Sequence, residues 1–319
     1  MRMKRTYLLL LGLGLCFSLQ AGGGIAWSQV TERVSVDSAG AEVDDPSYSP
    51  SISADGRYIA FESISPDLVT GDTNGKIDIF VHDRDADGNG TYDEPGPVGI
   101  STVRVSVDSA GVEVDDPSYA PSISADGRYV AFESISPDLV AGDGNGQVDI
   151  FVHDRDADGN GTYDEPGPVG ISTVRVSVDS GGSEVNGDSY AASISDDGRY
   201  VAFVSDAPDL VADDTNLRTD VFVHDRQTGA TTRVSVNLTG VEGNNNSNNP
   251  SISADGSSVA FVSDATNLVG DDTNGVPDIF VDDLQAAGGE DEGGGNGNSS
   301  SGCFIDTARY SSRVAKEVK

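Results

Sequence analysis

The 319-residue sequence has little cysteine, little positive charge and no helical pattern in its body, and each shortage excludes something. Its only cysteines are Cys16 and Cys303. Once an N-terminal signal is removed, no internal disulfide is possible, so the core, a metal or both must hold the domain together. Lys plus Arg number 19 against 53 Asp plus Glu, and the formal net charge is −34. This acidity argues against nucleic acid and anionic membranes as partners and favours cations.

Residues 1–28 have the pattern of a signal peptide. A basic start is followed by an apolar run over residues 7–19 and by the small-residue site Ala26-Trp27-Ser28. The apolar run is too short to span a membrane comfortably. We therefore expect cleavage near residue 28, no membrane insertion afterwards, and a bacterial protein that is secreted, periplasmic or on the cell surface.

Internal repeats dominate the rest of the chain. The unit Ser-Ile-Ser-Ala-Asp-Gly-Arg-Tyr begins at Ser51, recurs 71 residues later at Ser122, and returns with changes at Ser193 and Ser251. Hydrophobic residues make up 36% of the chain and come in short clusters. That distribution predicts a folded β protein with acidic loops instead of a disordered acidic chain.

Each repeat contains four strand-like pieces. In the first repeat a short Pro-Ser-Ile-Ser strand leads into an Ala-Asp-Gly turn at residues 54–56, and strands follow at 58–63, 78–82 and 103–107. The last piece alternates apolar and polar residues, as a half-buried strand does. Four strands per repeat is the unit of a propeller blade.

The fourth repeat lacks its last strand. It stops after residues 278–282, whereas a strand-like segment at residues 32–36 precedes the first repeat. Pairing of these two segments would complete the blade, close a four-blade ring and remove exposed edges. The alternatives are an incomplete ring that dimerises and an open stack of β units.

The repeats resemble those of a known family. Ser-Ile-Ser-Ala-Asp-Gly-Arg-Tyr-Val-Ala-Phe at 122–132 and Asp-Ile-Phe-Val-His-Asp-Arg at 78–84 and 149–155 are similar to the WD-repeat-like β-propeller repeats of TolB-type proteins. The resemblance covers roughly residues 30–285 and implies an all-β propeller domain over residues 29–285. Such propellers serve as scaffolds, periplasmic binding components and accessory domains of peptidases.

Two acidic inserts carry the clearest chemical signal. Both match the calcium-loop pattern D-x-[DN]-x-[DN]-G-x5-E, although neither is flanked by helices. Carboxylates on alternate residues converge when the backbone curls, and Ca²⁺ prefers six to eight oxygen ligands. Either Asp93 or Glu94, and likewise Asp164 or Glu165, could close the shell, and the alternative is a solvated acidic turn. The predicted metal residues are Asp83, Asp85, Asp87, Asn89 and Glu94, and in the copy Asp154, Asp156, Asp158, Asn160 and Glu165.

A second acidic pattern precedes the third strand of all four repeats. In the first repeat it consists of Asp72, Asn74 and Asp78. Such residues cap turns by accepting backbone N–H bonds, and a ring of weak cation sites is the alternative. The matching residues are Asp143, Asn145 and Asp149, then Asp214, Asn216 and Asp220, then Asp272, Asn274 and Asp278.

No catalytic set stands out. The three histidines, His82, His153 and His224, occupy one repeat position and are expected to serve the fold. There is no Gly-x-Ser-x-Gly elbow, no phosphate-binding Gly loop and no Cys–His pair in the mature chain. We therefore expect a non-enzymatic binding scaffold whose partner is a protein or polysaccharide of the cell envelope. The alternatives are a hydrolase or lyase acting on glycans or esters, and a purely structural envelope component.

The C-terminal region differs in composition. Residues 286–302 are rich in Gly, Asn and Ser and predict a flexible linker. Residues 303–319 begin Cys-Phe-Ile and resemble the Cys-Phe-Ile box at the C-terminus of many secreted bacterial proteins. Asp306 and Arg309 stand where that box has Ala, and the segment is short, so the resemblance is to a truncated sorting tag. The alternative is a disordered tail with one free thiol.

Overall fold

A computed structural model describes residues 30–94, 98–165 and 169–284 of the chain. The predicted signal peptide, linker and Cys-Phe-Ile tail lie outside these residues. The described part is all-β, as predicted, and none of it forms a helix that could cross a membrane.

Fifteen strands form four antiparallel sheets, and within each sheet the strands follow one another in chain order. We call the sheets blades one to four. The strands are β1 (Ser47–Ile52), β2 (Tyr58–Ser63), β3 (Asp78–Asp83), β4 (Ser101–Arg104), β5 (Ser118–Ile123), β6 (Tyr129–Ser134), β7 (Asp149–Asp154), β8 (Ser172–Arg175), β9 (Ser189–Ile194), β10 (Tyr200–Ser205), β11 (Asp220–Asp225), β12 (Ala230–Arg233), β13 (Ser247–Ile252), β14 (Ser258–Ser263) and β15 (Asp278–Asp283).

The predicted strands are found, and their boundaries differ most in the first and fourth strands of the repeat. β1 begins earlier than expected and contains a bulge at Ser49, whose φ is 51°. β4 ends at Arg104 instead of residue 107. Beyond it Val105 donates its N–H to the carbonyl of Ile79 at 2.8 Å, and Val107 then bridges to Glu113. The end of the predicted strand therefore leaves the sheet and begins the link to the next blade.

The hydrophobic core lies between consecutive blades. Side chains alternate across each strand, so Ile79 and Val81 of β3 face forward while Phe80 faces back. The forward side chains of blade one pack against Phe132 and Phe151 of blade two. The same arrangement joins blade two to three and blade three to four. Each blade therefore covers the face that its neighbour exposes.

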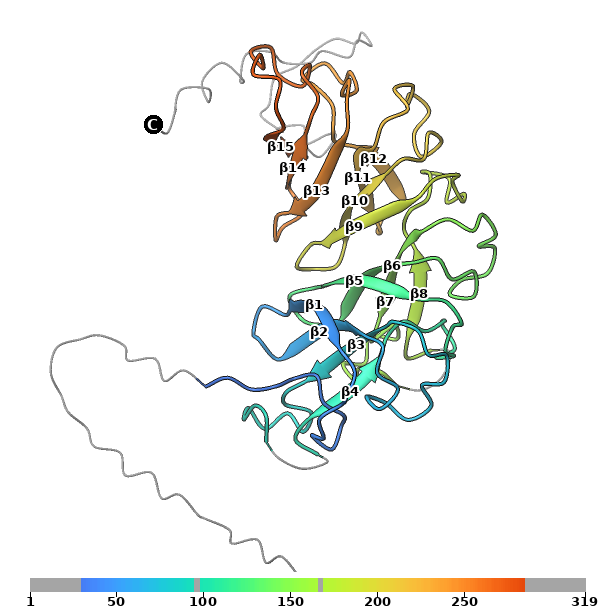
Figure 1. The fold of residues 1–319 in the computed structure, drawn as a ribbon, viewed down its shortest axis with the longest axis vertical. Helices are drawn as coiled ribbons and strands as arrows, with labels where there is room; N and C mark the ends of the chain where they lie inside the picture. Colours follow the sequence, from blue (N-terminus) through green and yellow to red (C-terminus); the bar gives the residue numbers. More distant parts are fainter. Residues whose placement is uncertain (1–29, 95–97, 166–168, 285–319) are drawn as a thin grey trace, which may run out of the picture.

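The four blades follow one another along an open arc, with blade one and blade four at opposite ends (Figure 1). The predicted four blades are confirmed, but the predicted closing strand is not formed. In the described residues blade four has three strands, and residues 32–36 do not pair with β15. Val34 and Val43 instead pack against Phe61 and Phe80 of blade one. The N-terminal segment is held there because it covers the apolar face that no earlier blade covers.

Candidate functional site: the acidic inserts and the groove beside them

The two inserts connect the third and fourth strands of blades one and two. Blade three has only a tight turn between β11 and β12. In blade one the insert is closed by two backbone bonds, from Ala86 N–H to Gly99 O at 2.9 Å and from Asp93 N–H to Arg84 O at 2.7 Å. The inserts are thus hydrogen-bonded loops that are added to a blade whose strands are otherwise the same.

The first predicted ligand of each insert belongs to the blade. Both carboxylate oxygens of Asp83 accept bonds from Arg57, at 2.7 and 2.8 Å. Asp154 and Arg128 repeat this pair at 2.7 and 2.9 Å. Blade three, which has no insert, carries the same pair between Arg199 and its Asp at residue 225. In all three blades this carboxylate, at the end of the third strand, therefore forms an ion pair with the arginine that precedes the second strand.

The other four predicted residues of the first insert are joined through Asn89, by its backbone N–H and by its side-chain amide. Asp85 accepts backbone N–H bonds from Asn89 and Gly90, at 2.9 and 3.0 Å, and so holds the loop in its curl. The Nδ2 group of Asn89 donates to Asp87 at 2.9 Å and also to Glu94. This NH2 group therefore stands between the two carboxylates.

The second insert repeats the geometry. Asp156 accepts from Asn160 N–H at 2.9 Å and from Gly161 N–H at 3.2 Å. The side chain of Asn160 bridges Asp158, at 2.9 Å, and Glu165. Two independent copies of one sequence pattern thus place their oxygen-bearing side chains alike.

The choice between neighbouring acids at the end of each loop has a structural answer. Asp93 turns away from the loop interior with a left-handed backbone, φ 59°, and forms an ion pair with Arg84. Glu94 is the residue that reaches Asn89. Asp164 and Glu165 divide their roles in the same way. The glutamates, and not the aspartates, are therefore the acids that contact the asparagine of each loop.

The second insert also borders a polar groove between blades one and two. Arg155, 1% exposed, lies against the rings of both Tyr58 and Tyr163, with its guanidinium carbon 4.9 and 5.0 Å from their centroids, and the two rings also contact each other at 5.5 Å. It also donates to the Gly127 carbonyl at 2.8 Å. The groove above it has a volume of about 650 Å³ and is lined mainly by polar side chains of both blades. Arg84 and Arg155 pair with local Asp residues, whereas Arg226, at the same repeat position, lies over the Tyr129 ring.

The second acidic pattern surrounds an arginine. Oxygens of Asp72, Asp78 and Glu113 lie within 4.8 Å of one another. Nη1 of Arg104 sits among them, at 3.4, 3.5 and 2.6 Å respectively. Asn74 caps the turn by accepting the backbone N–H of Lys76 at 2.7 Å. The capping role predicted for this pattern is observed, and the cation that it surrounds is a guanidinium.

The arginine recurs with the repeat. Arg175 contacts Asp143, Asp149 and Glu184, and Arg233 contacts Asp214, Asp220 and Glu242. The sequence pattern of acids alone does not reveal this set, but a signal for it is present. Four arginines directly precede Val-Ser-Val, namely Arg33, Arg104, Arg175 and Arg233.

Burial sets the charge of these groups. Desolvation and the neighbouring carboxylate of Asp78 raise the pKa of Asp72 to about 6. Desolvation opposes ionisation of Glu113 too, but bonds from Thr73 and Arg104 outweigh it and lower its pKa to about 2. Burial also raises the pKa of Asp78, so Glu113 is the one carboxylate of the three whose pKa is lowered.

The histidines serve the fold, as predicted. Nδ1 of His82, His153 and His224 lies 2.9 Å from the hydroxyl of Thr102, Thr173 and Thr231 respectively. These hydroxyls in turn donate to a carbonyl in the segment leading into the same blade, for example from Thr102 to Val36. Desolvation lowers the pKa of His153 to about 4. The imidazole is therefore neutral at physiological pH and ties the fourth strand to its blade.

Four consecutive antiparallel meander sheets, packed face to face, define an all-β protein of propeller-type blades. No family model and no curated protein matches the chain. Solved structures similar to it include TolB from Acinetobacter baumannii, at 17% identity and TM-score 0.40 over 75% of this chain and 41% of that one. A putative TolB from Agrobacterium tumefaciens matches at 16% identity and TM-score 0.37, over 70% of this chain and 56% of that one.

A puromycin-hydrolyzing peptidase from Mycobacterium tuberculosis is also similar, at 12% identity and TM-score 0.40. The matched region covers 76% of this chain and 29% of the peptidase chain. The chain thus spans less than two thirds of each of these proteins. At such scores the blade assignment rests on the sheet topology described above.

Proposed function

We propose that this protein is a non-enzymatic binding scaffold outside the cytoplasm, with two hairpin loops stiffened by Ca²⁺. The observation that carries the proposal is the duplicated arrangement of the inserts. In each, a carboxylate curls the loop and two further acids converge on one asparagine amide.

Calcium suits this arrangement chemically. Ca²⁺ takes oxygen ligands from carboxylates, amide and backbone carbonyls and water in flexible geometry. Asp87 and Glu94 face each other across Asn89, and rotation of that amide would present its oxygen in place of its NH2 group. Asp83 is the predicted residue that fits least, because Arg57 binds both of its oxygens. The proposed ligands are Asp85, Asp87, Asn89 and Glu94, with Asp156, Asp158, Asn160 and Glu165 in the copy.

The groove between blades one and two supports a binding role. It combines the edges of Tyr58 and Tyr163 with carboxylates and arginines, and it lies beside the second insert. Rigid aromatic side chains with adjacent polar groups are common in surfaces that bind peptides or sugars. We propose that an envelope protein or polysaccharide binds there. The signal-type N-terminus supports a location in the periplasm, at the cell surface or outside the cell.

Calorimetric titration of the secreted protein with Ca²⁺ tests the metal part. We expect two sites, and a melting temperature that is higher in Ca²⁺ than in EDTA because the ion binds only the folded loops. Glu94→Gln and Glu165→Gln should each remove one site. Asp115→Asn, which removes the same charge at an exposed acid outside the inserts, is the matched control.

Two results would contradict the proposal. Absence of Ca²⁺ binding by the unaltered protein would leave the inserts as solvated acidic turns. A panel of glycans and esters addresses the scaffold part: turnover that a single Asp→Asn change abolishes would make the protein an enzyme. Retention of a glycan or envelope peptide without turnover, weakened by Tyr163→Ala, is the expected outcome.

A further inference from the structure

The outer face of blade four is unfinished. Ile279 and Val281 of β15 are 71% and 63% exposed, whereas the equivalent Ile79 and Val81 of β3 are fully buried. In the described residues no strand pairs with the free edge of β15. A sheet edge of this kind, with apolar side chains and unpaired backbone groups, readily accepts another strand.

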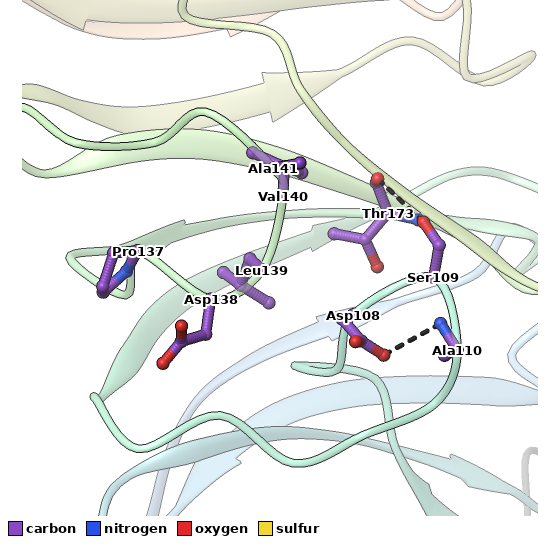
Figure 2. A pocket seen from close by; sticks show the side chains of 9 residues that line it. All are labelled: Asp108, Ser109, Ala110, Pro137, Asp138, Leu139, Val140, Ala141 and Thr173. Carbon is purple, nitrogen blue, oxygen red and sulfur yellow. Dashed lines mark hydrogen bonds between the residues drawn. The ribbon is translucent and has the colours of Figure 1, made fainter.

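A groove that blade two also has extends in blade four onto β15, where the fourth strand is missing. It has a volume of about 590 Å³ and lies between residues 236–239, residues 267–271 and residues 280–282, with Phe261 in its wall. Figure 2 shows the equivalent place in blade two, where Thr173 of β8 is present. Thr173 donates its N–H to the hydroxyl of Ser109 at 2.9 Å. In blade four the corresponding space is open.

The same end of the chain has an acidic pair without its arginine. Asn274 donates to Asp278 at 2.8 Å, as its counterparts do in the other blades. Asp272, the second acid of the pair, has a buried Oδ1 atom with no hydrogen-bond partner, as Asp72 and Asp214 each have one such oxygen, but in the described chain no guanidinium contacts it. In blades one to three a guanidinium contacts both acids of the pair.

The missing arginine is found at the other end of the chain. Arg33 and Glu42 stand 71 residues before Arg104 and Glu113. They already form an ion pair, at 2.6 Å, but their side chains are 54% and 67% exposed. The side chain of Arg104, which also contacts its two aspartates, is only 10% exposed. Half of the repeating charge cluster therefore lies at each end of the arc.

We propose that residues 30–43 of a second copy of this chain complete blade four, so that two copies join head to tail. Residues 30–33 pair with residues 280–283 in the register that joins β4 to β3. Arg33 of one copy then lies between Asp272 and Asp278 of the other.

A second copy fits better than the chain's own N-terminus. In one chain this segment is anchored on blade one, where Thr102 Oγ1 donates to the Val36 carbonyl at 2.6 Å. Blade one lies at the far end of the arc from blade four (Figure 1). A second copy placed next in the arc can keep its segment on its own blade one and still offer it to blade four.

Head-to-tail contacts close into a ring when the rotation per copy permits. Two copies of four blades give eight, and known propellers have roughly four to eight. The new junction is weaker than the internal ones because Ser258 replaces the tyrosine that Tyr58, Tyr129 and Tyr200 supply, and because no peptide link crosses it. Assembly should therefore depend on concentration.

Charge exchange tests the junction. Arg33→Glu would place a glutamate beside Asp272 of the other copy, so that two negative charges meet. Asp272→Arg would place an arginine beside Arg33 of the other copy, so that two positive charges meet. Each variant alone should be monomeric in sedimentation measurements, with a dissociation constant raised about 30-fold or more, as expected when a desolvated ion pair is broken. An equimolar mixture should dimerise, because one junction is then native and the other has its charges exchanged. Arg218→Glu, a reversal at an exposed arginine of blade three, should leave the dimer intact.

If another segment covers the free edge of β15, the same experiments should give different results. If the chain closes on itself, the unaltered protein is monomeric, mixing restores nothing, and the double variant Arg33→Glu/Asp272→Arg regains its melting temperature as a monomer. If residues 285–319 cover the edge, their deletion exposes it while Arg33→Glu has no effect. Either result overturns the proposal, as does a dimer that persists in both single variants. Val281→Lys, which alters an exposed side chain, should also dissociate the dimer without loss of folding.

Discussion

The ring of Tyr58 in blade one lies against Gly127 in the turn of blade two. A Cβ built on Gly127 would stand 2.1 Å from Cδ2 of that ring. Tyr129 and Gly198, and Tyr200 and Gly256, repeat the contact at the next two junctions. The glycine of the Ala-Asp-Gly turn therefore has two tasks, since it adopts a left-handed backbone and admits a neighbour's ring.

These two tasks can be separated by substitution. Gly56 and Gly127 have φ angles of 76° and 77°, but the nearest atom to a Cβ on Gly56 is 3.9 Å away. We expect Gly56→Ala to lower the free energy of unfolding by about 1 kcal/mol, from backbone strain alone. Gly127→Ala should cost about 1–3 kcal/mol more, because the tyrosine must move. Urea denaturation measures both, and equal losses would show that the ring contact is unimportant.

The stacked guanidinium of Arg155 should resist even conservative replacement. Lysine cannot form the forked bonds to Asp164, and it has no planar guanidinium to lie over the rings of Tyr58 and Tyr163. We expect Arg155→Lys to cost about 2–4 kcal/mol in the free energy of unfolding, since it disturbs a buried ion pair. Arg84→Lys is the control, because Arg84 is partly exposed and stacks only on Tyr92. Its loss should be under about 1 kcal/mol. Similar losses in both variants would contradict a special role for the stack.

One carboxylate should make the protein less stable as the pH rises. Desolvation and the charge of Asp220 raise the pKa of Asp214 to about 6, although Arg233 lies 3.4 Å away. The folded state then binds this proton more tightly than the unfolded state, whose pKa is near 3.8. The stabilisation by protonated Asp214 is therefore complete below the unfolded-state pKa of 3.8. It is lost as the pH rises through the folded-state pKa of about 6.

Asp214→Asn should remove that pH-dependent loss. The stability of the variant relative to the unaltered protein should increase between about pH 4 and pH 6 and then level off. Taking the difference cancels other titrating groups, including the histidines, whose lowered pKa values act in the opposite direction. Chemical denaturation at a series of pH values gives the curve. A flat difference would mean that Arg233 fully compensates Asp214.

Removal of calcium should loosen the inserts before the blades. In EDTA the acids around Asn89 and Asn160 lose the ion proposed to join them, while the backbone ladder of each blade is unchanged. We expect limited proteolysis in EDTA to cut within residues 85–99 and 156–170, and Ca²⁺ to suppress those cuts severalfold. The turn at residues 226–229 of blade three should be cut equally in both conditions. Protection of all three connections together would indicate a general effect of the ion.

Much of this fold could be predicted because the same local signals occur four times. β2 and β3 were placed nearly residue by residue, since alternating apolar side chains and an Asp-Gly turn fix both ends. The bulge at Ser49 could not be predicted, because a serine with positive φ has no sequence signature. The position of residues 32–36 was also ambiguous: the segment has the pattern of a fourth strand, and its apolar side chains fit blade one equally well.

The candidate site was predicted only in part. The spacing of acids in the inserts located the loops, but it could not show that Asp83 is bound by Arg57, 26 residues earlier, across a hairpin. Nor could spacing show that Arg104 stands among Asp72, Asp78 and Glu113, because Asp78 begins β3 and Glu113 lies in the link to the next blade. Such contacts depend on which segments the sheets bring together.

The turns of successive blades are joined by a short series of backbone bonds. Ala54 N–H donates to the Ala125 carbonyl at 2.9 Å, Ala125 N–H to Asp196 at 3.1 Å, and Asp196 N–H to Ala254 at 2.9 Å. Because every junction uses the same backbone atoms, a gene that gained or lost one unit of 71 residues would still encode matching surfaces on both sides of the change. The number of blades is therefore free to vary by recombination, while the sequence of any single blade remains constrained by its two neighbours.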